Sequence, residues 1–253
     1  MTPPITISPP SAASESSPPA GPRPYPEHPD LDTEFAAVQR AVAQFTMTSV
    51  ERCYALWEAT AYISRQQLPG ALVECGVWRG GSSMLAALAL LKCGDTSRDM
   101  YLFDTFEGMP EPSEHDIQSE TGRPADQLPE MIEKRRDSNV FAYATRGEVE
   151  RNMAATGYPP EHVHYIEGKV EETVPGAAPP RIALLRLDTD WYESTRHELE
   201  HLWDRLVPGG VLILDDYGYW AGARKAVDEF FESRSDAPLL NRIDRTGRIA
   251  VKR

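Results

Sequence analysis

Five short apolar runs alternate along the chain with longer segments of helical periodicity. The runs lie at residues 71–74, 100–104, 162–167, 181–188 and 211–215, and each of them ends at Asp or Glu. A short apolar run that ends at polar or turn residues is typical of a strand buried in a parallel sheet. The alternation therefore predicts an α/β fold built on a doubly wound, mostly parallel sheet.

The segments between and around these runs complete the predicted fold. Helices are expected between the strands, at residues 84–91, 146–156, 193–206 and 219–231. Residues 31–67 predict two further helices that are broken near Thr46–Thr48, with Thr48 or Ser49 as N-cap and Glu51 in the first turn. Residues 239–243 and 248–251 are expected to form a terminal hairpin, which makes seven strands with the last one antiparallel.

Three segments differ from this α/β core in composition. Residues 1–30 are rich in Pro and Ser and lack apolar periodicity, so we expect a disordered tail that takes no part in chemistry. Residues 31–69 are expected to form a helical cap on the main domain at residues 70–253. Residues 105–145 are polar, contain several prolines and show no clear core face, which is typical of a mobile lid.

Charge and cysteine content narrow the class of protein. A formal net charge of −13 argues against nucleic acid or an anionic membrane surface as a partner. The three cysteines are odd in number and show no CxxC spacing, which indicates free thiols in a reducing compartment. No apolar run approaches the length of a membrane span, and the N-terminus lacks a signal-peptide pattern. We therefore expect a cytoplasmic protein.

The first strand and the helix after it enclose a glycine-rich turn. Glu74 ends the strand, and Gly76, Gly80 and Gly81 follow, so the backbone can approach a ligand that a Cβ atom would exclude. Ligands in open α/β sheets bind at the carboxyl ends of the strands, against helix N-termini. Asp104 ends the second strand, where an acid can hold ribose hydroxyls in nucleotide-binding folds. A turn that is merely tight, with Asp104 capping the next turn, is the alternative.

Four carboxylates follow the fourth and fifth strands. Asp188 and Asp190 come after one strand, and Asp215 and Asp216 come after the other. Carboxylates crowded at one sheet edge repel one another unless a cation lies between them. Hard oxygen ligands without His or Cys favour Mg²⁺ or Mn²⁺ over zinc. The alternative is a set of solvated acids and helix N-caps, which explains a single acid better than it explains all four.

Four motifs together resemble the macrocin O-methyltransferase family. They are VECGVWRGG at residues 73–81, FDTFEG at 103–108, LDTD at 187–190, and PGG at 208–210 followed by DDY at 215–217. The resemblance runs from about residue 45 to residue 253. It implies a Rossmann-like class I methyltransferase fold, S-adenosylmethionine as methyl donor, and Mg²⁺.

The resemblance also implies roles for individual residues. Asp188, Asp215 and Asp216 would bind the metal, and Asp188 would take part in catalysis. The residues expected to bind the cofactor are Thr46, Met47, Glu74, Gly76, Ser82, Asp104, Gly168 and Asp188. Some family members carry a histidine base just before the helix expected at residues 146–156. This chain has no histidine between His115 and His162, so the base is open among His115, Asp190 and water.

Aromatic residues near the acids have two interpretations. Trp191 and Tyr192 fit core packing better than a wall against a sugar. Tyr217, Tyr219 and Trp220 follow the Asp215–Asp216 pair and fit either the core or the acceptor site.

The resemblance thus implies an O-methyltransferase acting on a vicinal diol, on a deoxysugar of a glycosylated natural product such as a macrolide or another polyketide, in antibiotic biosynthesis. The expected partner is a small-molecule glycoside, and a homo-oligomer is left open. A catechol-type methyltransferase is the main alternative. A nicotinamide-dependent oxidoreductase fits less well, because the glycine turn lacks the GxGxxG spacing. A ligand-binding protein without activity would not need the full set of acids.

Overall fold

A seven-stranded sheet in the order β3-β2-β1-β4-β5-β7-β6 forms the centre of the protein. The computed structural model describes residue 28 and residues 30–31, 33–138 and 140–253, so the expected tail lies almost wholly outside the described residues. The five central strands are parallel, and β7 is antiparallel to both β5 and β6. The predicted fold is confirmed. The strands are β1 (Ala71–Cys75), β2 (Met100–Asp104), β3 (Val163–Glu167), β4 (Ile182–Leu187), β5 (Leu206–Leu214), β6 (Asn241–Arg242) and β7 (Arg248–Val251).

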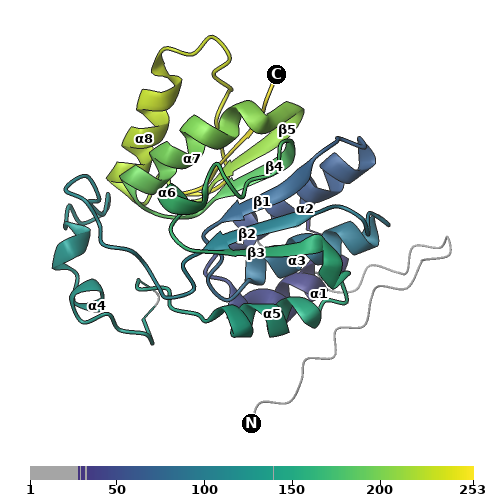
Figure 1. Cartoon of the computed structure of the whole chain (residues 1–253), viewed down its shortest axis with the longest axis horizontal. Coiled ribbons are helices and arrows are strands. Elements are labelled where there is room, and N and C mark those ends of the chain that lie inside the picture. Colours follow the sequence, from purple (N-terminus) through teal and green to yellow (C-terminus); the bar gives the residue numbers. More distant parts are fainter. Residues whose placement is uncertain (1–27, 29, 32, 139) are drawn as a thin grey trace.

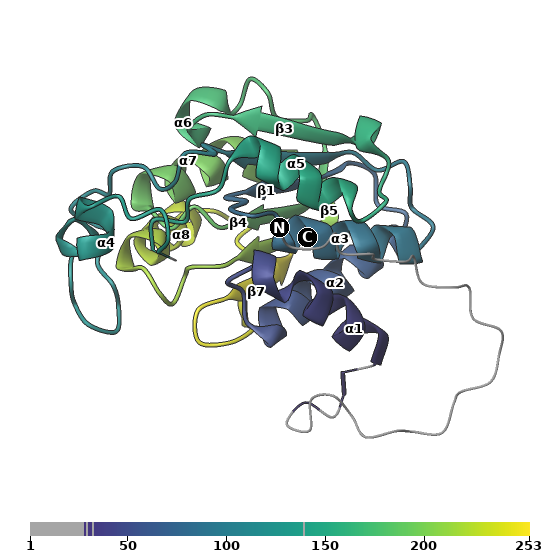
Figure 2. The same ribbon diagram turned by 90° about the horizontal axis from the view of Figure 1, so that it is seen from below.

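Helices cover both faces of the sheet (Figures 1 and 2). One face packs against α1 (Thr33–Val42), the 3₁₀ turn η1 (Ala43–Phe45), α2 (Val50–Arg65), α3 (Gly81–Lys92) and α5 (Arg146–Ala154). The other face packs against α6 (Val170–Thr173), α7 (Tyr192–Leu202) and α8 (Ala221–Glu232). Successive strand residues serve opposite layers: Leu72 packs with the first group and Val73 with the second. This alternation explains why the parallel strands are apolar on both sides.

The order of the strands locates the ligand crevice. The chain moves from β1 outward to β2 and β3, then returns to the other side of β1 to place β4 and β5. The carboxyl ends of β1 and β4 therefore flank a topological switch point, where loops diverge and leave a crevice. The acid-bearing loops after β4 and β5 and the glycine turn after β1 meet at this crevice.

Most element boundaries agree with the sequence pattern, with differences at the strand ends. Ser49 is the N-cap of α2, with its hydroxyl accepting from the Arg52 N–H at 3.2 Å, and Glu51 lies in the first turn as expected. The fifth strand begins at Leu206 instead of residue 211, because Leu206 pairs with β4 and the Gly209 N–H donates to the Lys252 carbonyl. Strand β6 has only two residues.

The segment at residues 105–145 contains more structure than its polar pattern indicates. It holds the 3₁₀ turn η2 (Ala125–Gln127) and the short helix α4 (Pro129–Ile132). It also contributes to a small apolar cluster, which corrects the expectation that it has no core face. The members of this cluster are Ala125, Leu128, Met131, Phe141, Trp191, Trp220 and Ala223. The aromatic partners come from the starts of α7 and α8, which the local pattern could not reveal. Mobility of the segment stays a prediction.

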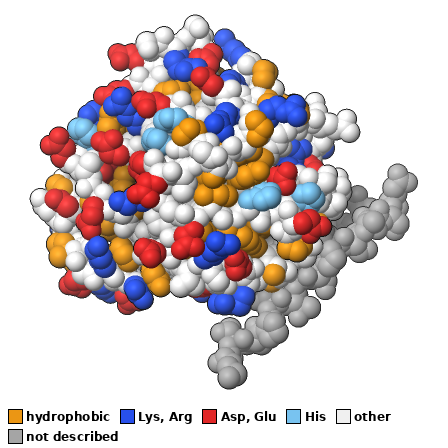
Figure 3. Space-filling model, in the orientation of Figure 1, with side chains coloured by type: hydrophobic (Ala, Val, Ile, Leu, Met, Phe, Trp, Pro, Cys, Tyr) orange, Lys and Arg blue, Asp and Glu red, His pale blue; other side chains and the backbone are white. Residues whose placement is uncertain are grey.

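The surface carries charges of both signs. On the face shown in Figure 3, acidic and basic side chains are interspersed, and hydrophobic side chains gather near the middle. Among the described helices, none combines the length and the apolar character needed to span a bilayer.

Candidate active site

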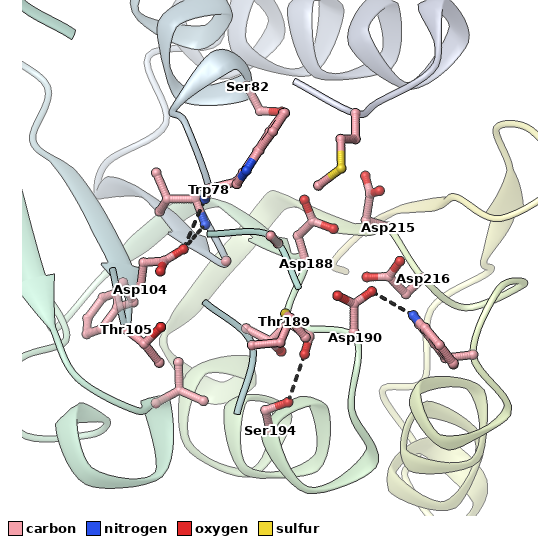
Figure 4. A pocket seen from close by; sticks show the side chains of 18 of the residues that line it. Trp78, Ser82, Asp104, Thr105, Asp188, Thr189, Asp190, Ser194, Asp215 and Asp216 are labelled. Carbon is pink, nitrogen blue, oxygen red and sulfur yellow. Dashed lines mark hydrogen bonds between the residues drawn. The ribbon is translucent and has the colours of Figure 1, made fainter. Parts of the chain in front are cut away.

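A cavity of about 350 Å³ lies over the carboxyl ends of the central strands. Its size is in the range of small-molecule sites. Figure 4 shows Asp104 and Thr105 on one side of the cavity and four aspartate carboxylates on the other. The residues expected to bind cofactor that line the cavity are Thr46, Met47, Gly76, Ser82, Asp104, Gly168 and Asp188. The structure therefore brings seven of these eight residues together from five separate segments.

The glycine turn after β1 is shaped by close backbone contact. Gly76 has φ +83°, and a Cβ at this position would lie 1.9 Å from the Asp188 carbonyl oxygen. Only glycine allows the loops after β1 and β4 to approach this closely. Gly81 is similarly confined, since a Cβ there would lie 2.5 Å from the Phe45 carbonyl oxygen. The turn, the start of α3 and the η1–α2 break thus form one rigid wall.

Asp104 organises this wall from the end of β2. Its Oδ2 accepts from the Val77 N–H at 2.7 Å and the Trp78 N–H at 3.0 Å, and its Oδ1 accepts from the Phe106 N–H at 2.7 Å. Burial raises the pKa of Asp104, although these backbone donors favour the charged form. The contact with Phe106 is the turn-capping role that the sequence left open. Asp104 nevertheless lines the cavity.

Glu74 does not line the cavity, which corrects its expected position. Its side chain is 2% exposed and accepts from Arg186 Nη1 at 2.6 Å and from the Ser83 hydroxyl. Burial raises the pKa of Glu74, and the Arg186 guanidinium opposes that shift. Glu74 therefore supports the site from beneath, through Arg186 and Ser83.

The acid cluster forms as expected at the ends of β4 and β5. Asp188, Asp215 and Asp216 each offer an oxygen within 4.8 Å of the others. Among the described residues, Asp216 Oδ2 is the buried side-chain oxygen without a hydrogen-bond partner. Burial, joined by neighbouring carboxylates, raises the pKa values of Asp188 and Asp216 well above the usual range. Three crowded carboxylates and an unpaired buried oxygen fit a hard divalent cation such as Mg²⁺ or Mn²⁺.

Asp190 is the fourth member of the cluster. It adopts a left-handed backbone conformation with φ +67°, and its Oδ1 accepts from Trp220 Nε1 at 2.8 Å. Burial and the nearby Asp188 charge raise the pKa of Asp190 to about 7. Thr189 beside it donates to Glu198 Oε1 at 3.0 Å. Burial raises the pKa of Glu198 well above the usual range, and this acid supports the loop through the Thr189 hydroxyl.

Two arginines that the motif search did not single out hold the cluster together. Arg186 donates to Asp188 Oδ2 at 2.7 Å and to Asp215 Oδ1 at 2.7 Å. Arg52 donates to Asp215 Oδ2 and, through Nε, to Asp244 at 3.0 Å. These cations offset part of the repulsion among the carboxylates. An arginine inside the apolar run at residues 181–188 was a usable signal, because a buried charge requires a partner.

The structure separates the remaining candidates. Tyr219 and Trp220 line the cavity, whereas Tyr217 donates its hydroxyl to Asp228 at 2.7 Å outside it. Trp191 and Tyr192 are 3% and 5% exposed, which agrees with core packing.

His115 also lies outside the cavity lining, which corrects its candidacy as a base. Its ring packs against Tyr192 with centroids 4.6 Å apart, and the Lys225 amino group lies 3.2 Å from its Nε2.

Comparisons with known proteins agree with this site. Residues 26–252 match the family model described as Macrocin-O-methyltransferase (TylF). The chain is 34% identical, over 88% of its length and 81% of the relative, to an 8-demethyl-8-(2,3-dimethoxy-alpha-L-rhamnosyl)-tetracenomycin-C 4'-O-methyltransferase of Streptomyces olivaceus. It is 32% identical to the mycinamicin III 3''-O-methyltransferase of Micromonospora griseorubida, over 86% of this chain and 85% of that protein.

Solved structures of methyltransferases share the fold. The O-methyltransferase NovP superposes with a TM-score of 0.69 at 32% identity, over 82% of this chain and 81% of that one. The calicheamicin methyltransferase CalS11 superposes with a TM-score of 0.61 at 18% identity, over 93% and 99% of the two chains, and supports the fold alone. The family model covers the helical cap, the glycine turn and the acid cluster in one continuous match. The protein is therefore an O-methyltransferase of the macrocin O-methyltransferase family, with the class I fold of S-adenosylmethionine-dependent methyltransferases.

Proposed function

We propose that the protein methylates a hydroxyl of a deoxysugar on a glycosylated natural product, with S-adenosylmethionine as donor and with Mg²⁺. The acid cluster at the edge of the cavity, opposite the glycine turn, is the observation that carries this proposal. The names of the relatives support the acceptor class, since one of them is a methyltransferase of a rhamnosyl tetracenomycin. We further propose that this reaction belongs to antibiotic biosynthesis.

The cofactor would occupy the half of the cavity formed by the glycine turn. S-adenosylmethionine would supply a methyl group that is already activated on its sulfonium. Asp104 offers carboxylate oxygens for ribose hydroxyls, while Val77 and Trp78 hold that carboxylate in place. Thr46 and Ser82, whose hydroxyl oxygens lie 3.4 Å apart, bring the η1–α2 break against the start of α3. This preformed wall would orient the donor toward the acid cluster, and positioning of reactants supplies much of the barrier reduction in such transfers.

Asp188, Asp215 and Asp216 would hold the metal. When bound, Mg²⁺ would chelate two neighbouring hydroxyls of the acceptor and lower the pKa of the hydroxyl that is methylated. Arg186 holds the carboxylates of Asp188 and Asp215 in place, and both residues line the cavity. Asp190 and solvent remain the candidates that would take the hydroxyl proton, because His115 lies elsewhere.

Calorimetry and turnover together test this function. S-adenosylhomocysteine should bind and NAD should not. This result would exclude the oxidoreductase alternative. With S-adenosylmethionine and Mg²⁺, p-nitrophenyl α-L-rhamnoside should be methylated, whereas 3,4-dihydroxybenzoate should react far more slowly. Faster methylation of the catechol would favour the catechol-type methyltransferase instead. A 3-deoxy analogue, which retains no pair of adjacent hydroxyls, would contradict diol chelation if it reacted as fast as the intact rhamnoside.

A further inference from the structure

The segment at residues 105–145 docks on the protein through one buried carboxylate. Asp116 is fully buried, and its Oδ2 accepts from the backbone N–H and the hydroxyl of Ser113, at 2.6 and 2.8 Å. Its Oδ1 accepts from the Tyr192 N–H at 2.8 Å. Tyr192 is the first residue of α7, and the helix receives no capping bond from the side chain of Trp191, its own N-cap residue. Asp116 thus caps α7 from a distant part of the chain, where the helix dipole favours a negative charge.

The first turn of α8 is shaped to receive the same carboxylate. A Cβ at Gly222 would lie 2.1 Å from Asp116 Oδ1, so any larger residue would displace the carboxylate. Backbone bonds continue the contact on both sides. The Ala221 N–H donates to the Ile117 carbonyl at 2.9 Å, and the Ser119 N–H donates to the Tyr219 carbonyl at 2.8 Å. Figures 1 and 2 show the segment that carries α4 at the end of the molecule where α7 and α8 lie.

This docking point lies next to the wall of the cavity. Trp191, which precedes Tyr192, packs edge-to-face on Trp220 with ring centroids 4.9 Å apart. Trp220 precedes the α8 turn that holds Asp116, and its Nε1 donates to Asp190 Oδ1. Asp116 therefore ties together the two loops that place Trp220 and Asp190 on the acceptor side of the cavity.

Asp188 and Asp215, which we propose to bind the metal, are held by the sheet and not by the Asp116 contact. The Asp188 N–H donates to the Cys75 carbonyl at 2.8 Å, and the Asp215 N–H donates to the Leu187 carbonyl at 3.0 Å, so both residues continue the sheet. Asp104 and the glycine turn are on the far side of the crevice. Loss of the Asp116 contact would therefore shift the acceptor wall while the cofactor half and the ligands Asp188 and Asp215 keep their places.

We propose that Asp116 is a positioning residue for the acceptor, an inference that rests on the proposed function. Its carboxylate locks the starts of α7 and α8 so that Asp190 and Trp220 present a preformed wall to the sugar. Alignment of an acceptor hydroxyl with a methyl donor is sensitive to displacements of about 1 Å. Asp116 acts through these residues and does not itself touch the reacting atoms.

A double-mutant cycle tests the contact. Gly→Ala within a helix normally stabilises it. Here Gly222→Ala should lower the melting temperature of the wild type by about 2–6 °C, because the new methyl group displaces Asp116. In the Asp116→Ala background the same change should have little effect or raise the melting temperature, although the Tyr192 Cβ remains 3.1 Å from the new atom. An equal decrease in both backgrounds would overturn the contact.

Hydrogen exchange and kinetics test the positioning role. In Asp116→Ala, the backbone amides at residues 189–195 and 217–222 should exchange faster. The exchange of those at 71–82 should not change. Unchanged exchange in all three regions would overturn the proposal. The kcat for p-nitrophenyl α-L-rhamnoside should fall about tenfold or more. The affinities for S-adenosylhomocysteine and Mn²⁺ should stay within about threefold, and Asp116→Asn, which keeps one acceptor oxygen, should recover part of the kcat.

Controls separate this role from general damage and from the proposed function. Asp137→Ala removes an exposed carboxylate of the same segment and should leave exchange and kcat unchanged. A loss of S-adenosylhomocysteine affinity as large as the loss of kcat would show that Asp116 serves general stability only. Absence of wild-type turnover on the rhamnoside would count against the proposed acceptor, and the exchange and melting experiments would still decide the role of Asp116.

Discussion

Arg186 and Asp215 form an ion pair across β4 and β5, with Nη2 and Oδ1 2.7 Å apart and neither side chain more than 5% exposed. The same guanidinium pairs with Glu74 and Asp188, so one cation connects the core beneath the site to the carboxylates that we propose to bind metal. Buried ion pairs add little net stability compared with apolar residues, but removal of one partner leaves an uncompensated charge. The arrangement makes the stability of the sheet depend on the same residue that orients the site.

Replacing Arg186 with Leu should therefore be strongly destabilising. The change leaves Glu74 and Asp215 without their shared cation and should lower the unfolding free energy by about 3–5 kcal/mol. Urea denaturation followed by circular dichroism measures this loss. Arg224→Ala is the matched control, because Arg224 is exposed and its closest approach to Asp228 is 3.9 Å. Adding Glu74→Leu to Arg186→Leu should restore part of the lost stability; no recovery would contradict the charge explanation.

Asp216 offers a pH-dependent prediction. Its pKa is raised by burial and by neighbouring Asp190 and Asp215, so the folded state binds the proton more tightly than the unfolded chain does. Ionisation of Asp216 therefore costs stability once the pH rises above the unfolded value of about 3.9. In EDTA, Asp216→Asn should melt higher than the wild type at pH 7–8, and the difference should disappear toward pH 4. A variant that melts lower throughout this range would indicate a structural role for the carboxylate.

Removal of divalent ions should abolish turnover. EDTA would take the proposed metal from Asp188, Asp215 and Asp216, and added Mg²⁺ or Mn²⁺ should restore the rate. Binding of S-adenosylhomocysteine should persist in EDTA, because the cofactor half of the cavity is built by the glycine turn and Asp104. Full activity in EDTA would exclude the metal mechanism while leaving a metal-independent methyltransferase.

Asp104→Ala should weaken S-adenosylhomocysteine binding by about 1.5–3 kcal/mol, as expected for lost hydrogen bonds to a charged group. The variant also frees the backbone N–H groups of Val77 and Trp78, so a lower melting temperature should accompany the loss. Calorimetry at 25 °C measures the affinity. Thr105→Ala is a control on the same loop, and it should change affinity less than Asp104→Ala does. Unchanged affinity in Asp104→Ala would remove the residue from the cofactor site.

The parallel sheet and the acid cluster could be predicted because both follow from local pattern. An apolar run that ends in an acid indicates a strand and also places its carboxylate at a known edge of the sheet. This rule was enough to predict that Asp188, Asp215 and Asp216 lie close together, and the four motifs supported the same prediction. The glycine turn was recognisable because glycines that follow a strand indicate a tight turn, whereas the contact of Gly76 with the Asp188 carbonyl appears only in the structure.

The sequence by itself determined the order of strands and helices, the family, and the edge of the sheet where the chemistry is placed. The tertiary structure alone decided that Glu74 lies beneath the cavity, that His115 packs on Tyr192, and that Asp116 caps α7. The physical reason is the distance along the sequence between residues that touch in the fold. Periodicity records the environment of each residue, whether buried or exposed, but pairs such as Glu74 with Arg186 are separated by more than a hundred positions. Their contact depends on how the strands and loops pack, which no local pattern encodes.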